Sequence, residues 1–256
     1  MNIIKRIVKF LLKKLFNYDL IRIRPDLAVQ RRLLKGKTVK IIFDVGANIG
    51  LTSTVYRKVF PDASIYAFEP FLPVFSQLKT RFVGDSKVKA FKLAFSDKAG
   101  VASFFVNAPV GGSSWTNSLL EPEDSKKKLF HDDDKFMKNE RRVDVETDTI
   151  DSFCEKNSID EIDVLKMDIQ GGELSALQGS AKKLSANKIG LLFIEVEFAR
   201  IYKNQPLFYE ICDFLAKNGY LLFDICNISH SENGQIVAGD AIFLSPKVRK
   251  DFLGAA

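Results

Sequence analysis

The stretch Ile41-Ile42-Phe43-Asp44-Val45-Gly46-Ala47-Asn48-Ile49-Gly50 decides the fold class. Its apolar residues predict a buried strand, and the glycines that follow predict a tight turn into a helix. This is the layout of a nucleotide-type ligand site at the edge of an α/β sheet. The glycine spacing differs from Gly-x-Gly-x-x-Gly, which places a pyrophosphate at a helix N-terminus. An adenosyl ligand without phosphate is therefore favoured over a dinucleotide.

A second apolar strand, at residues 64–68, ends in Glu69-Pro70, nineteen residues after Gly50. A carboxylate at such a strand end accepts hydrogen bonds from both hydroxyls of a ribose. The alternative is an ordinary strand-to-helix turn followed by a surface glutamate. Because the two features occur together, we predict a ligand that contains a ribose.

Strand and helix patterns alternate along the chain from residue 40. Strands are predicted at 40–45, 64–69, 88–95, 101–106, 142–146, 162–167, 189–196, 220–226 and 236–244, and helices near 50–59, 71–82, 148–157, 172–184 and 206–218. Such alternation predicts an α/β fold with a parallel sheet that helices cover on both faces. The last two strands have no helix between them, so we expect an antiparallel hairpin at the sheet edge.

The composition is typical of one large α/β domain, which we place at residues 39–256. The chain has 256 residues with 46% hydrophobic content, enough for a full core. Its three cysteines are far apart in sequence, which indicates reduced core residues of a cytoplasmic protein. Because the chain has only two histidines, we expect carboxylates to carry out most of its acid/base chemistry. The stretch 107–140 is too long for an ordinary connection and is predicted to be an inserted loop or lid.

Residues 1–38 form a basic N-terminal segment. Residues 1–40 carry 12 Lys or Arg and 2 Asp, which is a net charge of +10. Because the whole chain has a net charge of +6, the remainder has a net charge of −4. Apolar residues from Ile3 to Leu15 recur at helical spacing, which predicts a basic amphipathic helix that is too short and charged to cross a bilayer. Two predictions stay open for residues 1–16: packing on the domain or a second subunit, or contact with an anionic membrane surface.

A second informative cluster is Val164-Leu165-Lys166-Met167-Asp168-Ile169-Gln170-Gly171-Gly172-Glu173. An apolar strand runs into Asp168, and two glycines turn the chain into a helix. Because ligands bind beyond the carboxyl ends of parallel strands, we predict that Asp168 faces the reacting centre. The next strand places Glu195 at the same edge. The alternative is that Lys166 pairs with a neighbouring carboxylate and Glu173 serves as a helix-terminus charge.

Asp97 lies in the turn at residues 96–100, at the end of the third predicted strand. There it is placed to accept a hydrogen bond from the exocyclic amine of adenine. The alternative is that the turn simply joins the strands 88–95 and 101–106 as a hairpin.

Taken together, five stretches resemble the FkbM family of S-adenosylmethionine-dependent methyltransferases: Asp44–Gly50, Ala67–Pro70, Ser96–Gly100, Asp148–Asp151 and Lys166–Glu173. The resemblance covers about residues 40–244. It implies a Rossmann-like class I methyltransferase fold with a mostly parallel seven-stranded sheet. It also implies that S-adenosylmethionine is the cofactor. Where this chain has Gln170, the family more often has Glu.

The same resemblance implies roles for individual residues. Gly46, Asn48 and Gly50 line the methionine part of the cofactor, in the same stretch as Asp44. Glu69 binds the ribose and Asp97 reads the adenine. The implied reaction is O-methylation of a hydroxyl on a sugar, glycan, glycolipid or other small molecule.

Methyl transfer to a hydroxyl needs an in-line oxygen nucleophile and profits from a general base. We predict that Asp168 is this base, with Glu195 as the second choice and Lys166 adjusting the ionisation. No motif demands a metal ion, although the two carboxylates leave a divalent cation open. The loop with Ser113, Ser114 and Trp115 is predicted to border the acceptor, because Trp rings stack on sugars. The alternative is a surface loop with its Trp in the core.

Two other function classes stay open. A non-catalytic adenosyl-binding module would keep Glu69 and Asp97 but lack an acceptor pocket. A nucleic-acid methyltransferase would use the basic N-terminus as its electrostatic footprint. Because the domain itself is acidic, we expect no nucleic-acid partner. The expected location is the cytoplasm or the inner face of the membrane, and the oligomeric state stays open.

Overall fold

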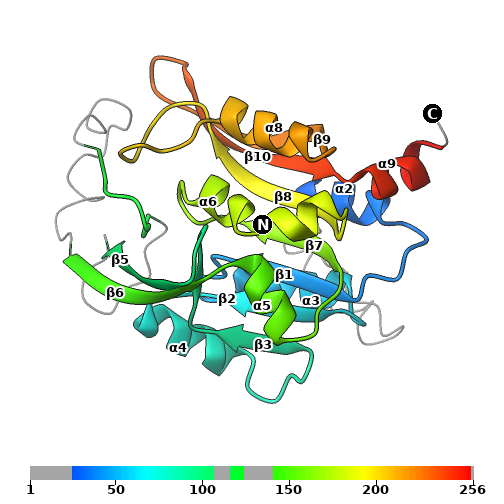
Figure 1. The fold of residues 1–256 in the computed structure, drawn as a ribbon, viewed down its shortest axis with the longest axis horizontal. Coiled ribbons are helices and arrows are strands. Elements are labelled where there is room, and N and C mark those ends of the chain that lie inside the picture. The colour runs from blue at the N-terminus through cyan, green and yellow to red at the C-terminus, as the bar shows by residue number, and fades with distance from the viewer. Residues whose placement is uncertain (1–24, 107–115, 124–140, 255–256) are drawn as a thin grey trace, which may run out of the picture.

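The computed structural model describes residues 25–106, 116–123 and 141–254. Its centre is a seven-stranded sheet in the order β3-β2-β1-β7-β8-β10-β9 (Figure 1). The bounds of its strands are β1 Ile41–Val45, β2 Ser64–Phe68, β3 Val88–Phe91, β7 Ile162–Met167, β8 Ile189–Glu197, β9 Leu221–His230 and β10 Ile236–Leu244. Strands β3, β2, β1, β7 and β8 pair in parallel, and β10 runs antiparallel to both of its neighbours. The predicted sheet with its antiparallel edge hairpin is confirmed.

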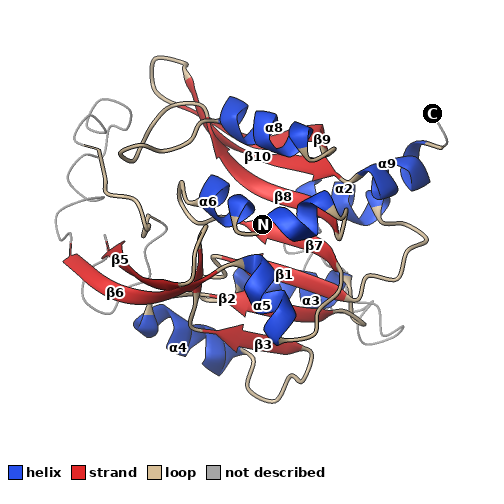
Figure 2. Cartoon of the chain, in the orientation of Figure 1, coloured by secondary structure: helices blue, strands red, loops and turns tan. Residues whose placement is uncertain are grey.

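Helices cover both faces of this sheet (Figure 2). Their bounds are α2 Pro25–Leu33, α3 Leu51–Val59, α4 Leu72–Arg81, α5 Ile150–Lys156, α6 Glu173–Gln178, α7 Ala181–Ser185, α8 Phe208–Lys217 and α9 Pro246–Leu253. Buried side chains of α5, α6, α7 and α8 pack on one face of the sheet. Those of α2, α3, α4 and α9 pack on the other, as alternating strands and helices predict.

A smaller sheet in the order β4-β6-β5 stands beside the main one. Its strands are β4 Ala94–Phe95, β5 Gly100–Val106 and β6 Arg141–Asp148. The single strand predicted at 88–95 is therefore wrong, because β3 belongs to the main sheet and β4 to the smaller one. The hairpin alternative is also wrong, since β5 pairs with β6. The apolar face of β5 packs with Phe71 and Val145 in a separate small core, which explains this pairing.

The helix predicted at 172–184 is interrupted between α6 and α7. At Gly179 a Cβ atom would lie 2.1 Å from the carbonyl oxygen of Ser96, so the chain approaches another backbone there without a side chain. Helix α9, which follows the last strand, was not predicted.

The described part of the basic N-terminal segment packs on the domain. Leu27 and Leu33 of α2 are buried, and the Tyr56 hydroxyl donates to Gln30 Oε1 at 3.0 Å. Lys37 pairs with Asp251 at 2.6 Å, which joins this segment to α9. No helix within the described ranges has the length and apolar character needed to cross a bilayer. The predicted helix within residues 1–16 lies outside the described residues.

Among the described residues, strand β9 forms the outer edge of the main sheet and pairs with β10 alone. Leu221, Leu222 and Ile228 on this strand are exposed.

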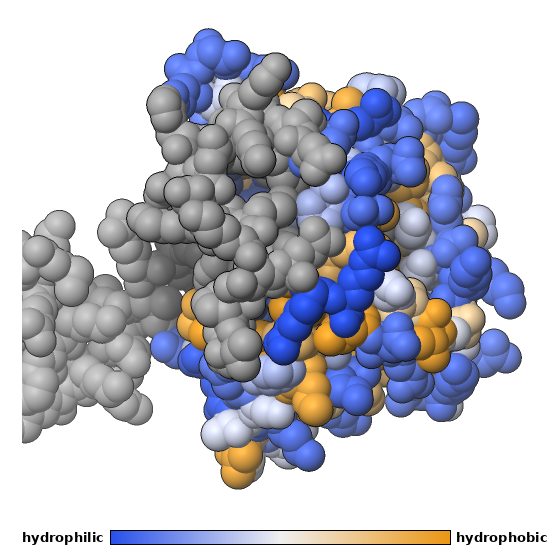
Figure 3. Space-filling model, turned by 90° about the vertical axis from the view of Figure 1, so that its left-hand side faces the viewer, coloured by the Kyte–Doolittle hydropathy of each residue, from blue (hydrophilic) through white to orange (hydrophobic). Residues whose placement is uncertain are grey.

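Figure 3 shows the side of the molecule at the left of Figure 1, where polar and apolar residues are interspersed over the described surface.

Candidate active site

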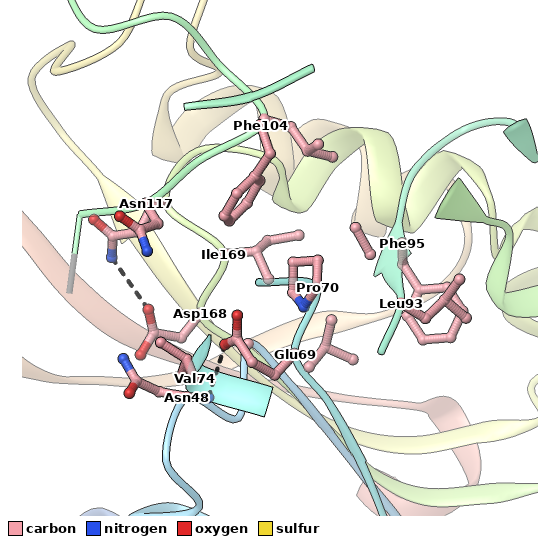
Figure 4. A pocket seen from close by; sticks show the side chains of 15 residues that line it. Asn48, Glu69, Pro70, Val74, Leu93, Phe95, Phe104, Asn117, Asp168 and Ile169 are labelled. Atoms are coloured by element: carbon pink, nitrogen blue, oxygen red, sulfur yellow. Dashed lines mark hydrogen bonds between the residues drawn. The ribbon is translucent and has the colours of Figure 1, made fainter. Parts of the chain in front are cut away.

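A pocket of about 660 Å³, counting the space open to solvent, lies at the carboxyl ends of β1, β2 and β7 (Figure 4). Its polar wall includes Gly46, Asn48, Glu69 and Asp168, and its apolar wall includes Leu93, Phe95 and Phe104. Open α/β sheets bind ligands at this end of their strands. The fold thus brings the main site residues predicted from the sequence into one cavity.

Gly46 lets the loops after β1 and β7 touch. Its φ is +71°, and a Cβ atom would lie 1.9 Å from the carbonyl oxygen of Asp168. The Asp168 N–H donates to the Val45 carbonyl at 3.2 Å. A side chain at position 46 would separate the two loops, so a glycine is required here.

Glu69 is held at the pocket wall by two backbone donors. Its Oε2 accepts from the Asn48 N–H at 3.1 Å, and its Oε1 accepts from the Phe71 N–H at 2.9 Å. Burial outweighs these bonds and raises the pKa of Glu69 to about 7. Each oxygen keeps acceptor capacity for a further donor.

Asp44 and Lys166 form a buried ion pair behind the pocket. Lys166 Nζ lies 3.1 Å from Asp44 Oδ1 and 3.8 Å from Asp168 Oδ2. Burial disfavours the charged amine, but the attraction of these two carboxylates is larger, and the pKa of Lys166 is raised. Asp44 Oδ2 accepts from the Ser53 hydroxyl at 2.5 Å. Asp44 therefore holds Lys166 in place and does not line the pocket.

Asp168 is the accessible member of a carboxylate cluster. Its side chain is 38% exposed, and Gln170 Nε2 lies between Asp168 Oδ1 at 3.1 Å and Glu195 Oε2 at 2.5 Å. Burial, followed by repulsion from Asp168 and Glu197, raises the pKa of Glu195 well above its usual value. Of these carboxylates, Asp168 is the one that lines the pocket.

A second pocket, of about 650 Å³ counting open space, shares Gly46, Asn48 and Asp168 with the first. Lys166 and Asp240 lie in the wall of the second pocket. Asp168 thus stands between two cavities.

The segment 116–123 closes one side of the site. The Ser118 hydroxyl donates to the Gln170 carbonyl at 2.7 Å, and the Tyr202 hydroxyl lies 3.0 Å from the Thr116 carbonyl. Asn117 lines the same pocket as Asp168. Asn117, Phe95 and Phe104 were not predicted as site residues.

Other predicted residues lie away from the pocket wall. Gly50, at φ +83°, lacks the side chain that would meet Leu78 and Phe82 at the C-terminal end of α4, so it permits packing of α3. Asp97 is exposed in its turn and accepts from the Ser96 hydroxyl at 3.0 Å. Ser113, Ser114 and Trp115 lie outside the described residues.

The carboxylates near Asp168 do not form a recognisable metal site. Within the ranges that the structure describes, no group of three or more His, Cys, Asp or Glu side chains has an arrangement that could hold a metal ion.

Residues 44–222 match the FkbM methyltransferase domain, from β1 to the start of β9. The chain belongs to the FkbM methyltransferase family. It is therefore an S-adenosylmethionine-dependent methyltransferase, and the non-catalytic module is set aside.

Two curated relatives of this FkbM domain carry methyltransferase names. The 2-O-methyltransferase NoeI of Sinorhizobium fredii is 24% identical over 195 residues, which cover 74% of this chain and 77% of NoeI. The methyltransferase sdnD of Sordaria araneosa is 34% identical over 161 residues, or 54% of this chain and 59% of sdnD. The chain thus spans little more than half the length of sdnD.

Solved structures resemble the FkbM domain only distantly. An rRNA methylase from Streptococcus thermophilus has a TM-score of 0.47 and 8% identity, over 88% of this chain and 98% of that chain. This likeness does not bear on the acceptor.

The pocket fits S-adenosylmethionine. The Glu69 carboxylate is fixed by two N–H donors and suits ribose hydroxyls, and the apolar wall at Leu93 and Phe95 suits an adenine ring. Gly46 also lines the pocket, and its missing side chain lets the loop that carries Asp168 come close.

Proposed function

We propose that this methyltransferase O-methylates a hydroxyl of a sugar, glycan or glycolipid. The observation that carries the proposal is Asp168, an accessible carboxylate between two pockets. A carboxylate there suits a hydroxyl acceptor, whose proton must leave when the oxygen is methylated. The name of NoeI, a 2-O-methyltransferase, agrees with an oxygen acceptor, although 24% identity does not carry its acceptor over.

In this proposal Glu69 binds the ribose, Gly46 and Asn48 contact the methionine part, and Leu93 with Phe95 contacts the adenine. The bound cofactor supplies a methyl group on a positively charged sulfur. Asp168 accepts the proton of the acceptor hydroxyl at a carboxylate oxygen. Lys166 Nζ, 3.8 Å from Asp168 Oδ2, places a positive charge beside that carboxylate.

The first experiment identifies the acceptor class. Methyl-labelled S-adenosylmethionine is incubated with the protein and with separate polysaccharide, lipid, nucleic-acid and protein fractions of cells. Label in the polysaccharide or glycolipid fraction supports the proposal, and label confined to nucleic acid or protein contradicts it.

With that fraction as acceptor, Asp168→Asn should lower kcat at least about a hundredfold, because a general base contributes roughly 10²–10⁴-fold. Calorimetry should find the affinity for S-adenosylhomocysteine nearly unchanged. Asp213→Asn, an exposed site on α8 paired with Lys217, is the matched control and should behave as the wild type. Unchanged kcat in Asp168→Asn would remove Asp168 from the role.

The acceptor side of the site extends, in this proposal, to Ser113, Ser114 and Trp115. Trp115 is two residues from Asn117, which lines the pocket. Trp115→Ala should raise the KM for the acceptor with little effect on cofactor affinity. An unchanged KM contradicts an acceptor contact.

Residues 1–16 are proposed to contact an anionic membrane surface. Lys5, Lys9, Lys13 and Lys14 lie among the apolar residues of this stretch, and each cation near such a surface contributes about 1 kcal/mol. Deleting residues 1–16 should abolish cosedimentation with phosphatidylserine vesicles but preserve cofactor binding. If the shortened protein instead loses its fold or oligomeric state without vesicles, the segment is a packing element.

A further inference from the structure

Gln170 occupies the point where three loops of the site meet. It follows β7, its backbone carbonyl accepts from Ser118 of the segment 116–123, and its side chain lies beside Tyr202. Its φ of 58° is in the left-handed region, which non-glycine residues rarely adopt. The surrounding contacts therefore determine this conformation.

Every polar group of the Gln170 side chain has a partner. Nε2 donates to Asp168 Oδ1 at 3.1 Å and to Glu195 Oε2 at 2.5 Å. Oε1 lies 3.2 Å from the Tyr202 hydroxyl, whose single hydrogen is shared between this oxygen and the Thr116 carbonyl at 3.0 Å. This pattern leaves one orientation for the amide, with its nitrogen toward the two carboxylates.

The amide also separates two acidic groups that repel each other. The Asp168 and Glu195 carboxylates both approach the same nitrogen, so removal of the amide leaves them without their shared donor. Asp168 is accessible on its other side and would be free to rotate out of its present orientation. An interaction with a charged acceptor is among the stronger hydrogen bonds in proteins.

The same amide is connected to the acceptor side of the pocket. The Tyr202 hydroxyl contacts both Gln170 Oε1 and the carbonyl of Thr116, and Thr116 precedes Asn117. Asn117 lines the same pocket as Asp168 (Figure 4). Gln170 and Tyr202 thus join the loop after β7 to the segment 116–123.

We propose that Gln170 is a positioning residue, which holds the Asp168 carboxylate toward the pocket and keeps it in register with the wall that carries Asn117. The inference rests on the proposed role of Asp168 as the base. Gln170 acts on the reaction through Asp168, so its loss should affect turnover more than cofactor binding.

The test compares Gln170→Ala, Gln170→Glu and Tyr202→Phe in the full-length protein. Labelled S-adenosylmethionine and the cell fraction that accepts methyl groups serve as substrates, from pH 5.5 to 9. Gln178→Ala and Gln178→Glu, at an exposed position of α6, are the matched controls. Affinity for S-adenosylhomocysteine is measured in parallel.

Gln170→Ala should lower kcat about tenfold or more, the effect of losing a hydrogen bond to a charged group, with cofactor affinity within about twofold. The acid side of its pH–rate profile should move to higher pH, because the donor that favours the ionised base is gone. Tyr202→Phe should lower kcat by a smaller factor.

Gln170→Glu gives the most specific signature. The family more often has Glu at this position, so the variant should keep activity near neutral pH. At alkaline pH a third carboxylate cannot donate to Asp168 and repels it, so activity should fall more steeply with rising pH than in the wild type. Below neutral pH the introduced carboxyl group is protonated and can donate one hydrogen bond to Asp168. Activity relative to the wild type should therefore recover. A residue that only supports the fold would not produce this pH dependence.

The two proposals fail in different ways. If Asp168→Asn is inactive but both Gln170 variants keep the wild-type kcat and pH profile, the positioning role is overturned and the base assignment stands. If Asp168→Asn is fully active, the assignment of Asp168 as the base is overturned, and the positioning role of Gln170 is overturned with it. Should Gln170→Ala not fold by thermal melting, Gln170→Glu and Tyr202→Phe carry the decision, and wild-type profiles in both overturn the inference.

Discussion

Glu69 is a single residue whose charge changes near neutral pH. Its pKa is raised to about 7 because it is buried. Ribose hydroxyls donate to a carboxylate, so cofactor binding favours the ionised form. Affinity for S-adenosylhomocysteine should therefore fall as the pH drops below about 7, and calorimetry at pH 6, 7 and 8 measures this. Glu69→Gln should weaken binding by about 1–3 kcal/mol at pH 8 and remove most of the pH dependence.

The control for this prediction is Glu155→Gln, an exposed position on α5. It should show the wild-type affinity at each pH. Equal affinities for Glu69→Gln and the wild type at all three pH values would show that the ribose is bound elsewhere.

At the scale of elements, the turn between β1 and α3 depends on Gly46. Gly46→Ala should destabilise the protein in two ways: it strains a left-handed backbone, and it places a Cβ atom 1.9 Å from the Asp168 carbonyl. Gly84→Ala separates the two effects, because Gly84 has φ +83° and open space around its Cβ position. Urea denaturation should give a loss of about 1 kcal/mol for Gly84→Ala and roughly 1–3 kcal/mol more for Gly46→Ala. Equal losses would contradict the close approach.

The main sheet and the site residues at strand ends were predictable because local sequence patterns mark them. Asp168 and Glu69 directly follow apolar strands, and parallel strands bring such positions to one edge. The division of residues 88–95 into β3 and β4 was not predictable, since it depends on pairing with Thr147 and Asp148 far along the chain. Asn117 and Phe104 reach the pocket through the smaller sheet, and no local pattern marks them.

Two predicted cofactor residues have local explanations that the sequence does not reveal. Gly50 is required by the packing of α3 against Leu78, and Asp97 is placed by its turn. A glycine or aspartate near a strand end has the same sequence signature whether it contacts a ligand or only forms a turn.

For the whole molecule, the buried carboxylates predict an unusual dependence of stability on pH. The pKa values of Glu69 and Glu173 are raised to about 7, and those of Glu195 and Glu197 lie well above their usual value. Between pH 4.5 and 7 the folded protein therefore binds more protons than the unfolded chain, and the free energy of unfolding falls as the pH rises.

The cofactor-free protein should thus have a higher urea midpoint at pH 5.5 than at pH 8. The free energy of unfolding should differ by a few kcal/mol between the two pH values. The trend reverses only at lower pH, where Asp148, whose pKa is lowered by its bond to Lys156 despite burial, becomes protonated. Glu197→Gln should reduce the difference between the two pH values. A midpoint that rises steadily from pH 5.5 to pH 8 would contradict this account.

The position of β10 between β8 and β9 has a consequence for biosynthesis. Strand β9 leaves the ribosome first, yet within the described part of the chain it pairs only with β10, which ends at Leu244. Until those residues emerge, Leu221 and Leu222 belong to a strand without its native partner, and exposed strands of this kind attract chaperones or aggregate. A chain that ends just before residue 236 would lack β10 and would leave β9 without its partner.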